Sequence, residues 1–218
     1  MPAAPANCID LQWAFFPGFD IRNSAVATRH WKTADMVDMY RFNTPEGAAN
    51  ETTLTKVLRL NYVSEQYELV AVIEWEEVVS ESQVKFLTAD ATTTVSQLRQ
   101  KHPERPNSWY DDSSRTLKRL LTIPRSRYFS AGDSHYKWGP GDRRKEDLMV
   151  CLPRSDALSR VIDKLCGQCV QTVFPNRDVC FYEGTTNRLR VTPEGQQVMD
   201  ELIVTLLLNL YCRELNLW

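Results

Sequence analysis

The stretch TPEGQQVMDELIVTLLLNLYCR, residues 192–213, predicts a long buried helix. Thr192 and Pro193 form a helix start, because the threonine side chain can accept a backbone hydrogen bond and proline suits the first helical position. Glu194 complements the positive end of the helix dipole. The middle turns are apolar on nearly every side, which is typical of a helix enclosed by the rest of a fold. The apolar pairs recur at every fourth residue: Val198/Met199, Leu202/Ile203, Leu206/Leu207 and Leu210/Tyr211.

Other apolar patterns predict an α+β fold around this helix. In Tyr67–Glu76 the side chains alternate between two faces, which indicates a strand. One face carries Tyr67, Leu69, Ala71, Ile73 and Trp75, and the other carries Glu68, Val70, Val72 and Glu74. The order of the C-terminal elements gives a β-α-β-β-α unit with a buried last helix, and the whole predicts a mainly antiparallel sheet with helices on one face. We predict strands at Leu11–Phe16, Lys56–Val63, Tyr67–Glu76, Gln83–Thr88, Glu146–Leu152, Asp178–Tyr182 and Arg188–Val191. We predict the other helices at Trp31–Phe42, after a Thr94 cap through Lys101, at Arg115–Leu121 and at Ser155–Val173, and a glycine- and aromatic-rich loop at Ile123–Lys145.

Length and composition indicate one composite globular domain over residues 1–218, with a possible internal boundary within 103–145. The chain has 218 residues, of which 43% are hydrophobic and 25% charged, values that fit an ordinary globular protein. No apolar stretch is long enough to span a membrane, so no membrane partner is expected. The first ten residues lack the pattern of a secretory signal, which favours reduced cysteines and a cytoplasmic or nuclear location.

A complete catalytic set is not visible in the sequence. The stretch Gly132-Asp133-Ser134 resembles the nucleophile block of GDS-type esterases, which take their base from a histidine near the C-terminus. The histidines here are His30, His102 and His135, and His135 follows Ser134 too directly for the two side chains to face one another. Phosphate-binding glycine motifs are absent as well. We therefore predict a non-catalytic protein without a cofactor, and an enzyme is the least favoured alternative.

The cysteines allow two interpretations. Cys166 and Cys169 form a C-x-x-C motif inside a predicted helix, where their spacing places them on one apolar face as buried thiols. The alternative is a zinc site completed by Cys151 and Cys180, although this spacing matches no established zinc motif. A redox pair is a further alternative, but its first cysteine is normally at a helix N-terminus.

Charge is distributed unevenly along the chain. Residues 1–114 hold 10 Lys/Arg against 16 Asp/Glu, whereas residues 115–154 hold 10 against 4. Such a basic segment with aromatic residues can bind nucleic acid or an acidic protein surface. Glu74, Glu76 and Glu77 are candidate partners, and with Glu81 they otherwise form a solvated acidic face. The candidate binding residues are Arg115, Lys118, Arg119, Arg125, Arg127, Tyr128, Tyr136, Lys137, Trp138, Arg143, Arg144 and Lys145.

The sequence therefore favours a non-catalytic structural or adaptor subunit that binds a protein partner or copies of itself. The alternative is an RNA- or DNA-binding accessory protein that uses the basic segment 115–145. Protein association is preferred because the net charge of −2 opposes non-specific attraction to nucleic acid.

Overall fold

A computed structural model describes residues 8–15, 20–30, 33–45, 53–98, 127–131, 134–140, 166–171, 177–215 and 217. The strands are β1 (Ile9–Phe15), β2 (Ser24–Arg29), β3 (Met36–Asn43), β4 (Thr53–Asn61), β5 (Gln66–Trp75), β6 (Gln83–Phe86), β7 (Ala91–Thr94), β8 (Arg127–Ala131), β9 (Ser134–Pro140), β10 (Cys166–Gln171), β11 (Arg177–Glu183) and β12 (Arg188–Val191). The helices are α1 (Val95–Leu98), α4 (Pro193–Gln196) and α5 (Met199–Glu214).

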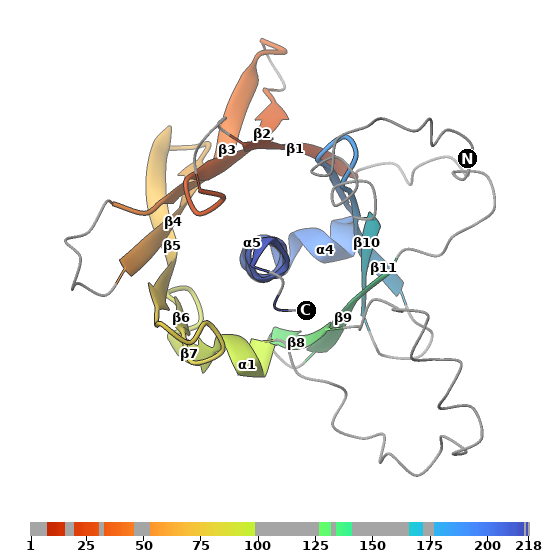
Figure 1. Ribbon diagram of the computed structural model, residues 1–218. Coiled ribbons are helices and arrows are strands. Elements are labelled where there is room, and N and C mark those ends of the chain that lie inside the picture. The colour runs from red at the N-terminus through yellow and green to blue at the C-terminus, as the bar shows by residue number, and fades with distance from the viewer. Residues whose placement is uncertain are drawn as a thin grey trace, which may run out of the picture.

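These strands form a single antiparallel sheet of twelve strands that curves around α5 (Figure 1). The order across the sheet is β7-β6-β5-β4-β3-β2-β1-β12-β11-β10-β9-β8. The pairing of β1 with β12 joins the early part of the chain to the late part, with Leu11 opposite Leu189. The two edge strands, β7 and β8, do not pair, and α1 lies between them in contact with both. The result is a nearly closed cylinder of strands.

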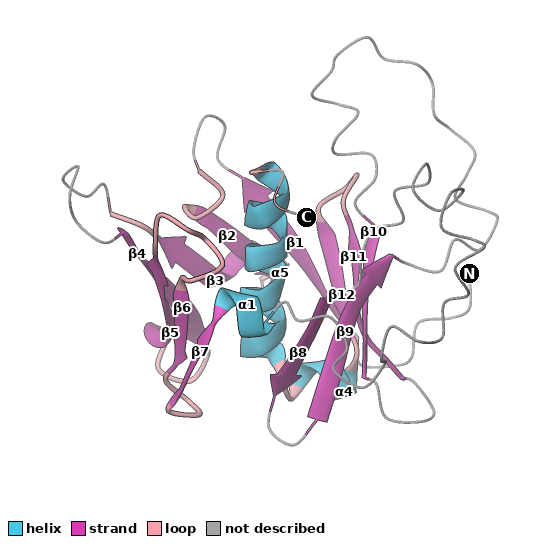
Figure 2. Cartoon of the chain, turned by 60° about the horizontal axis from the view of Figure 1, so that its bottom comes forward, coloured by secondary structure: helices cyan, strands magenta, loops and turns pink. Residues whose placement is uncertain are grey.

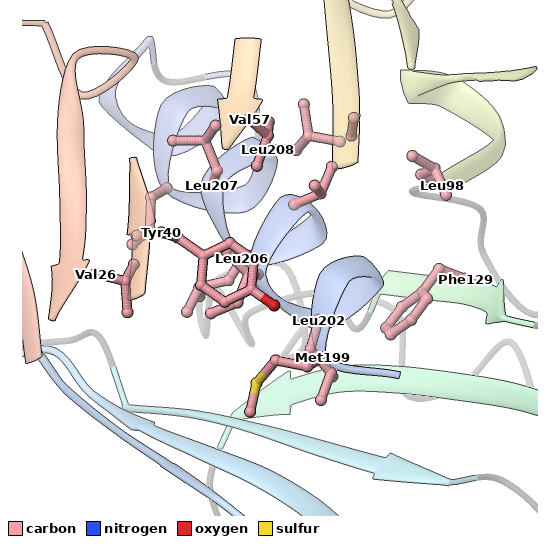
Figure 3. Packing of buried hydrophobic residues seen from close by; sticks show 14 of the residues in the cluster. Val26, Tyr40, Val57, Leu98, Phe129, Met199, Leu202, Leu206, Leu207 and Leu208 are labelled. Atoms are coloured by element: carbon pink, nitrogen blue, oxygen red, sulfur yellow. The ribbon is translucent and has the colours of Figure 1, made fainter. Parts of the chain in front are cut away.

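The helix α5 fills the inside of this cylinder, as Figure 2 shows from the side. Twelve of its sixteen residues are buried, so that it contacts the wall on nearly every side. The wall supplies the matching apolar face: in β5, Ala71, Ile73 and Trp75 point inward and Glu74 points outward. Figure 3 shows Leu202, Leu206 and Leu208 of the helix among the wall residues. The predicted buried helix and the mainly antiparallel sheet are confirmed, but the sheet wraps around the helix and does not lie flat beneath it.

The predicted helix start is also confirmed, but the helix is divided in two. Thr192 Oγ1 accepts a hydrogen bond from the Gly195 backbone N–H at 3.3 Å, as a helix cap does. Gly195 packs so tightly on β11 that an added Cβ would collide with the Val179 carbonyl oxygen. The first turn, α4, is therefore held against the wall, and Val198 leaves the helical conformation with φ −124° and ψ 34°. The chain then turns to run along the axis as α5 (Figure 1).

Three predicted elements were wrong. The predicted helix Trp31–Phe42 contains most of strand β3, in which Tyr40 and Phe42 point inward. The predicted loop Ile123–Lys145 contains strands β8 and β9. Part of the predicted helix Ser155–Val173 is strand β10, so the described C-terminal order is β-β-β-α-α and not β-α-β-β-α. The physical reason is the same in each case, because a short segment pairs with neighbours that are distant in sequence. The predicted elements Arg115–Leu121 and Glu146–Leu152 lie outside the described residues.

Candidate functional site

The predicted basic segment is described in part. Arg127, Tyr128, Tyr136, Lys137 and Trp138 lie on the paired strands β8 and β9. The other candidates lie outside the described residues: Arg115, Lys118, Arg119, Arg125, Arg143, Arg144 and Lys145.

Two aromatic rings of this segment belong to the core. Trp138 is 4% exposed, and its indole Nε1 donates a hydrogen bond to Thr205 Oγ1 of α5 at 3.0 Å. Tyr136 is buried and stacks on Phe129 with ring centroids 5.2 Å apart. Arg127 is buried as well. These three side chains are covered by the fold, so they cannot stack on bases at the surface.

Tyr128 and Lys137 differ from these residues because they are only partly buried. They are opposite each other in the β8–β9 register, on the face that points away from α5. The Lys137 amino group lies 5.9 Å from the centre of the Tyr128 ring, within the range of a cation–π contact. Of the candidate binding residues that the structure describes, this pair is what remains at the outer surface.

The acidic residues at the end of β5 and in the turn to β6 are exposed to solvent. Glu74, Glu76, Glu77 and Glu81 are all exposed. The turn itself is ordered, because the Glu76 N–H donates to the hydroxyl of Ser82 at 3.0 Å and the Glu81 N–H donates to the Val78 carbonyl at 2.8 Å. None of the four carboxylates forms an ion pair with another described residue. They are therefore available to cations from outside the described structure.

The charged group deepest inside the cylinder is the Asp200 carboxylate on the first turn of α5. It accepts a hydrogen bond from the Tyr40 hydroxyl at 2.6 Å and from Arg59 Nη1 at 2.8 and 3.0 Å. Figure 3 shows the Tyr40 ring directed at the helix. Burial, together with the neighbouring Asp200 carboxylate, raises the pKa of Tyr40 well above its ordinary value. The arrangement keeps the tyrosine protonated and attaches α5 to strands β3 and β4.

The next residue, Glu201, is also affected by this environment. Burial, and then the nearby Asp200 carboxylate, raise the pKa of Glu201 above its usual range.

Three interior tryptophans donate their indole N–H to other side chains of the same chain. Their hydrogen bonds go to side-chain hydroxyls: Trp13 to Ser24 at 3.0 Å, Trp75 to Thr55 at 2.7 Å and Trp138 to Thr205 at 3.0 Å. The Trp138 bond connects the wall to α5, whereas the Trp13 and Trp75 bonds connect neighbouring strands within the wall.

The catalytic pattern considered in the sequence does not assemble. Ser134 and His135 are neighbours on strand β9, and His135 Nδ1 lies 2.8 Å from the hydroxyl of Ser130 on β8 instead. That contact is exposed, and an exposed serine–histidine pair lacks the water-excluding environment that strengthens electrostatic catalysis.

The cysteines are placed differently from the helical prediction. Cys166 and Cys169 lie on strand β10 and not in a helix, so the argument that helical spacing places them on one face does not apply. Cys180 is free and buried, and burial raises the pKa of its thiol well above the ordinary value. Within the described residues, no three His, Cys, Asp or Glu side chains come together as metal ligands do. Cys151 lies outside them, so the zinc alternative keeps its place as a hypothesis.

The fold and the surface define the class of protein. It has a curved antiparallel sheet that encloses its own helix, and charged side chains are exposed on the outer surface. The chain belongs to a family of unknown function, DUF6593, whose match covers residues 20–210. Neither a curated protein nor a solved structure matches the chain. None of the helices in the described part is both long enough and apolar enough to cross a membrane.

Proposed function

We propose that this chain is a non-catalytic structural or adaptor subunit that acts by binding protein chains, including copies of itself. The observation that carries the proposal is the position of α5. The helix occupies the inside of the sheet, and Leu202, Ile203, Leu207 and Leu208 are essentially inaccessible to solvent. Within the described residues α5 and the inner faces of the strands bury one another, so we expect recognition to use the outer surface.

Complementary charges support self-association as the mode of binding. The segment 115–154 has a net charge of +6 and the segment 1–114 a net charge of −6, from the counts of Lys/Arg and Asp/Glu given above. Glu74, Glu76 and Glu77 are exposed on an ordered turn, which suits them to receive cations of a neighbouring copy. Opposite charges on two surfaces accelerate encounter and fix orientation, and their effect weakens with salt.

The alternative function is RNA or DNA binding through the basic segment 115–145. The outward pair Tyr128 and Lys137 favours it, because single-stranded nucleic acid is bound by exposed aromatic rings beside cations. Tyr136 and Trp138 weigh against it, since both are used in the core. Protein association is therefore the version that we prefer.

Light scattering of the purified chain over a range of salt and protein concentrations tests the proposal. The chain should form an oligomer whose mass falls as salt rises. The triple variant Glu74→Lys, Glu76→Lys, Glu77→Lys should be monomeric, and so should Arg125→Glu, Arg143→Glu, Arg144→Glu. Because each variant carries the charge that the other lost, mixing the two should restore association.

Two results would count against the proposal. A chain that stays monomeric at every concentration is not a self-associating subunit. A monomer that binds single-stranded RNA or DNA, with an affinity that falls steeply with salt, is instead the nucleic-acid-binding protein of the alternative.

A further inference from the structure

The tip of the β4–β5 hairpin exposes apolar side chains to an unusual degree. Val63 is 96% exposed and Tyr62 is 42% exposed. Water contact with apolar surface is unfavourable, so a valine held almost entirely in solvent gains free energy from any partner that covers it. The tip is also removed from the acidic turn at the other end of β5.

The tip is held in one shape by its own hydrogen bonds. Asn61 Oδ1 accepts from the backbone N–H of Val63 at 2.8 Å and from that of Ser64 at 3.3 Å. Asn61 Nδ2 in turn donates to Glu68 Oε1 at 2.6 Å. Glu65 adopts a positive φ of 54°, which closes the turn. A partner that binds this tip therefore loses little free energy to ordering it.

The charges at the tip favour a cationic partner. Glu65 and Glu68 are exposed carboxylates, and residues 62–68 contain no lysine or arginine. The Tyr67 ring is already covered by the Arg41 guanidinium of the same chain at 4.3 Å, so Glu65 and Glu68 are the groups that would receive a partner's cations. The tip thus combines an apolar knob with groups that attract lysine or arginine.

The apolar surface continues from the tip along the outer wall. Leu60 is opposite Tyr67 and Leu58 is opposite Leu69, and these two pairs share the face that points away from α5. Leu69 is 39% exposed there. The surface is therefore long enough to accept more than a single side chain.

The chain contains a segment with the complementary chemistry. The residues RTLKRLL, 115–121, carry three cations and no acid, and their sequence pattern predicts a helix. Leu117, Leu120 and Leu121 have the spacing of one helical face. We infer that the hairpin tip, with Tyr62 and Val63 as its apolar anchor, binds the segment 115–121 of a second copy of this chain. The inference rests on the proposed self-association and names the surface that receives part of the basic segment.

The tip suits this occupant better than the acidic turn between β5 and β6. That turn offers four carboxylates, but its exposed large apolar residue is Val78 alone. Carboxylates by themselves attract cations without fixing a leucine-bearing face, whereas the tip supplies both kinds of contact. The turn then receives the cations of 125–145, and the tip receives 115–121.

A labelled synthetic peptide of residues 113–123 provides the probe, and fluorescence anisotropy with the full-length chain measures its binding. Val63→Ser, which removes the apolar contact without adding charge, should weaken binding by at least about tenfold, and Val63→Asp should also weaken it although its carboxylate adds attraction for the cations. Leu87→Asp is the matched control, since Leu87 is 39% exposed in the next turn at the same end of the sheet. A peptide with serine at the three leucine positions keeps the charge and should bind more weakly than the parent. Thermal melts of each variant confirm that it is folded.

Light scattering of full-length Val63→Asp separates this inference from the proposed function. A shift to lower oligomer mass supports the inference. An oligomer unaffected by Val63→Asp but lost on reversal of Glu74, Glu76 and Glu77 overturns the inference and leaves the function standing. A chain that is monomeric at all concentrations and does not bind the peptide overturns both. Peptide binding by a chain that never self-associates also overturns the inference, because the occupant is then not a second copy.

Discussion

The two ends of α5 are attached to the wall by different physics. At the N-terminal end, Asp200 is 5% exposed and is bound by Tyr40 and Arg59. At the C-terminal end, Tyr211 packs on Trp75 at 4.6 Å, and the Arg22 guanidinium lies 5.5 Å from the Trp75 ring and 5.0 Å from the Tyr211 ring.

The two attachments should differ in how strongly a substitution destabilises the fold. A buried carboxylate and its partners depend on each other, because the loss of one leaves a desolvated polar group without compensation. A partly exposed arginine over two rings can return to water when its contacts are lost. The N-terminal attachment is therefore expected to be sensitive to substitution, and the C-terminal attachment to be permissive.

A substitution in the middle of α5 should cause a larger loss of stability than a substitution at either end. Leu206 is 3% exposed, and Leu206→Asp would bury an unpaired carboxylate at a cost of several kcal/mol, enough to unfold a typical domain. Circular dichroism and thermal melts should show loss of the folded state. A soluble variant with wild-type melting would mean that α5 does not form the core.

The N-terminal attachment should come next. Asp200→Ala leaves Arg59 and Tyr40 without their acceptor and should cost about 3–5 kcal/mol in urea unfolding. Tyr40→Phe removes one hydrogen bond and keeps the Arg59 pair, so it should cost about 1–1.5 kcal/mol. Equal costs for the two variants would contradict the central role of the carboxylate.

The C-terminal attachment should be weaker. Arg22→Ala removes the cation over two rings and its ion pair with Asp20, and it should cost about 1–2 kcal/mol. Arg22→Lys keeps the charge but loses the planar stacking, so unfolding should place it between wild type and alanine. A loss at Arg22 as large as that at Asp200 would remove the contrast between the two ends.

The smallest effect concerns pH at the N-terminal end. Because the folded pKa of Glu201 is raised, the folded chain holds this proton more tightly than the unfolded chain. Its contribution is present at low pH and is lost as pH rises from the unfolded value of 4.5 through the folded pKa. Glu201→Gln should therefore raise the melting temperature at pH 7 and change it little at pH 4. An equal gain at both pH values would show that the carboxyl charge is not the cause.

Local patterns in the sequence were sufficient for the parts of the fold with strong periodicity. The alternation of Ala71, Ile73 and Trp75 in β5 and the Thr192-Pro193 helix start are examples, although the register shift opposite Val57 and Leu58 turns Leu69 to the outer face. The prediction for strand β3 was wrong for two reasons. A register shift between Val26 and Ala27 of the partner strand interrupts the alternation in β3, and Met36, Met39 and Tyr40 have the spacing of one helical face. In β8 and β9 the alternating pairs Phe129/Ala131 and Tyr136/Trp138 are short and lie among charged residues and glycines. The sequence therefore does not predict these two strands.

The candidate surfaces were less accessible to sequence reasoning. The exposure of the acidic turn agrees with its composition. Asp200 and Arg59 are 141 residues apart, and nothing local pairs them. The hairpin tip is not recognisable as a surface in the sequence, which shows neither that Asn61 fixes the turn nor that Val63 is left in solvent. Such features depend on three-dimensional proximity, and a single sequence does not encode that proximity locally.

The position of α5 has a consequence for how the chain folds. During synthesis all twelve described strands emerge before the helix that fills the sheet. The edge of β1 that pairs with β12 stays unpaired until β12 has been synthesised. The inward faces of the early strands therefore stay exposed until α5 has been synthesised, a state that is prone to aggregation. Because the pairing of β1 with β12 and the Asp200–Arg59 ion pair join distant parts of the chain, folding should also be slow. The wall can therefore close only after α5, which follows every strand in the sequence, is in place.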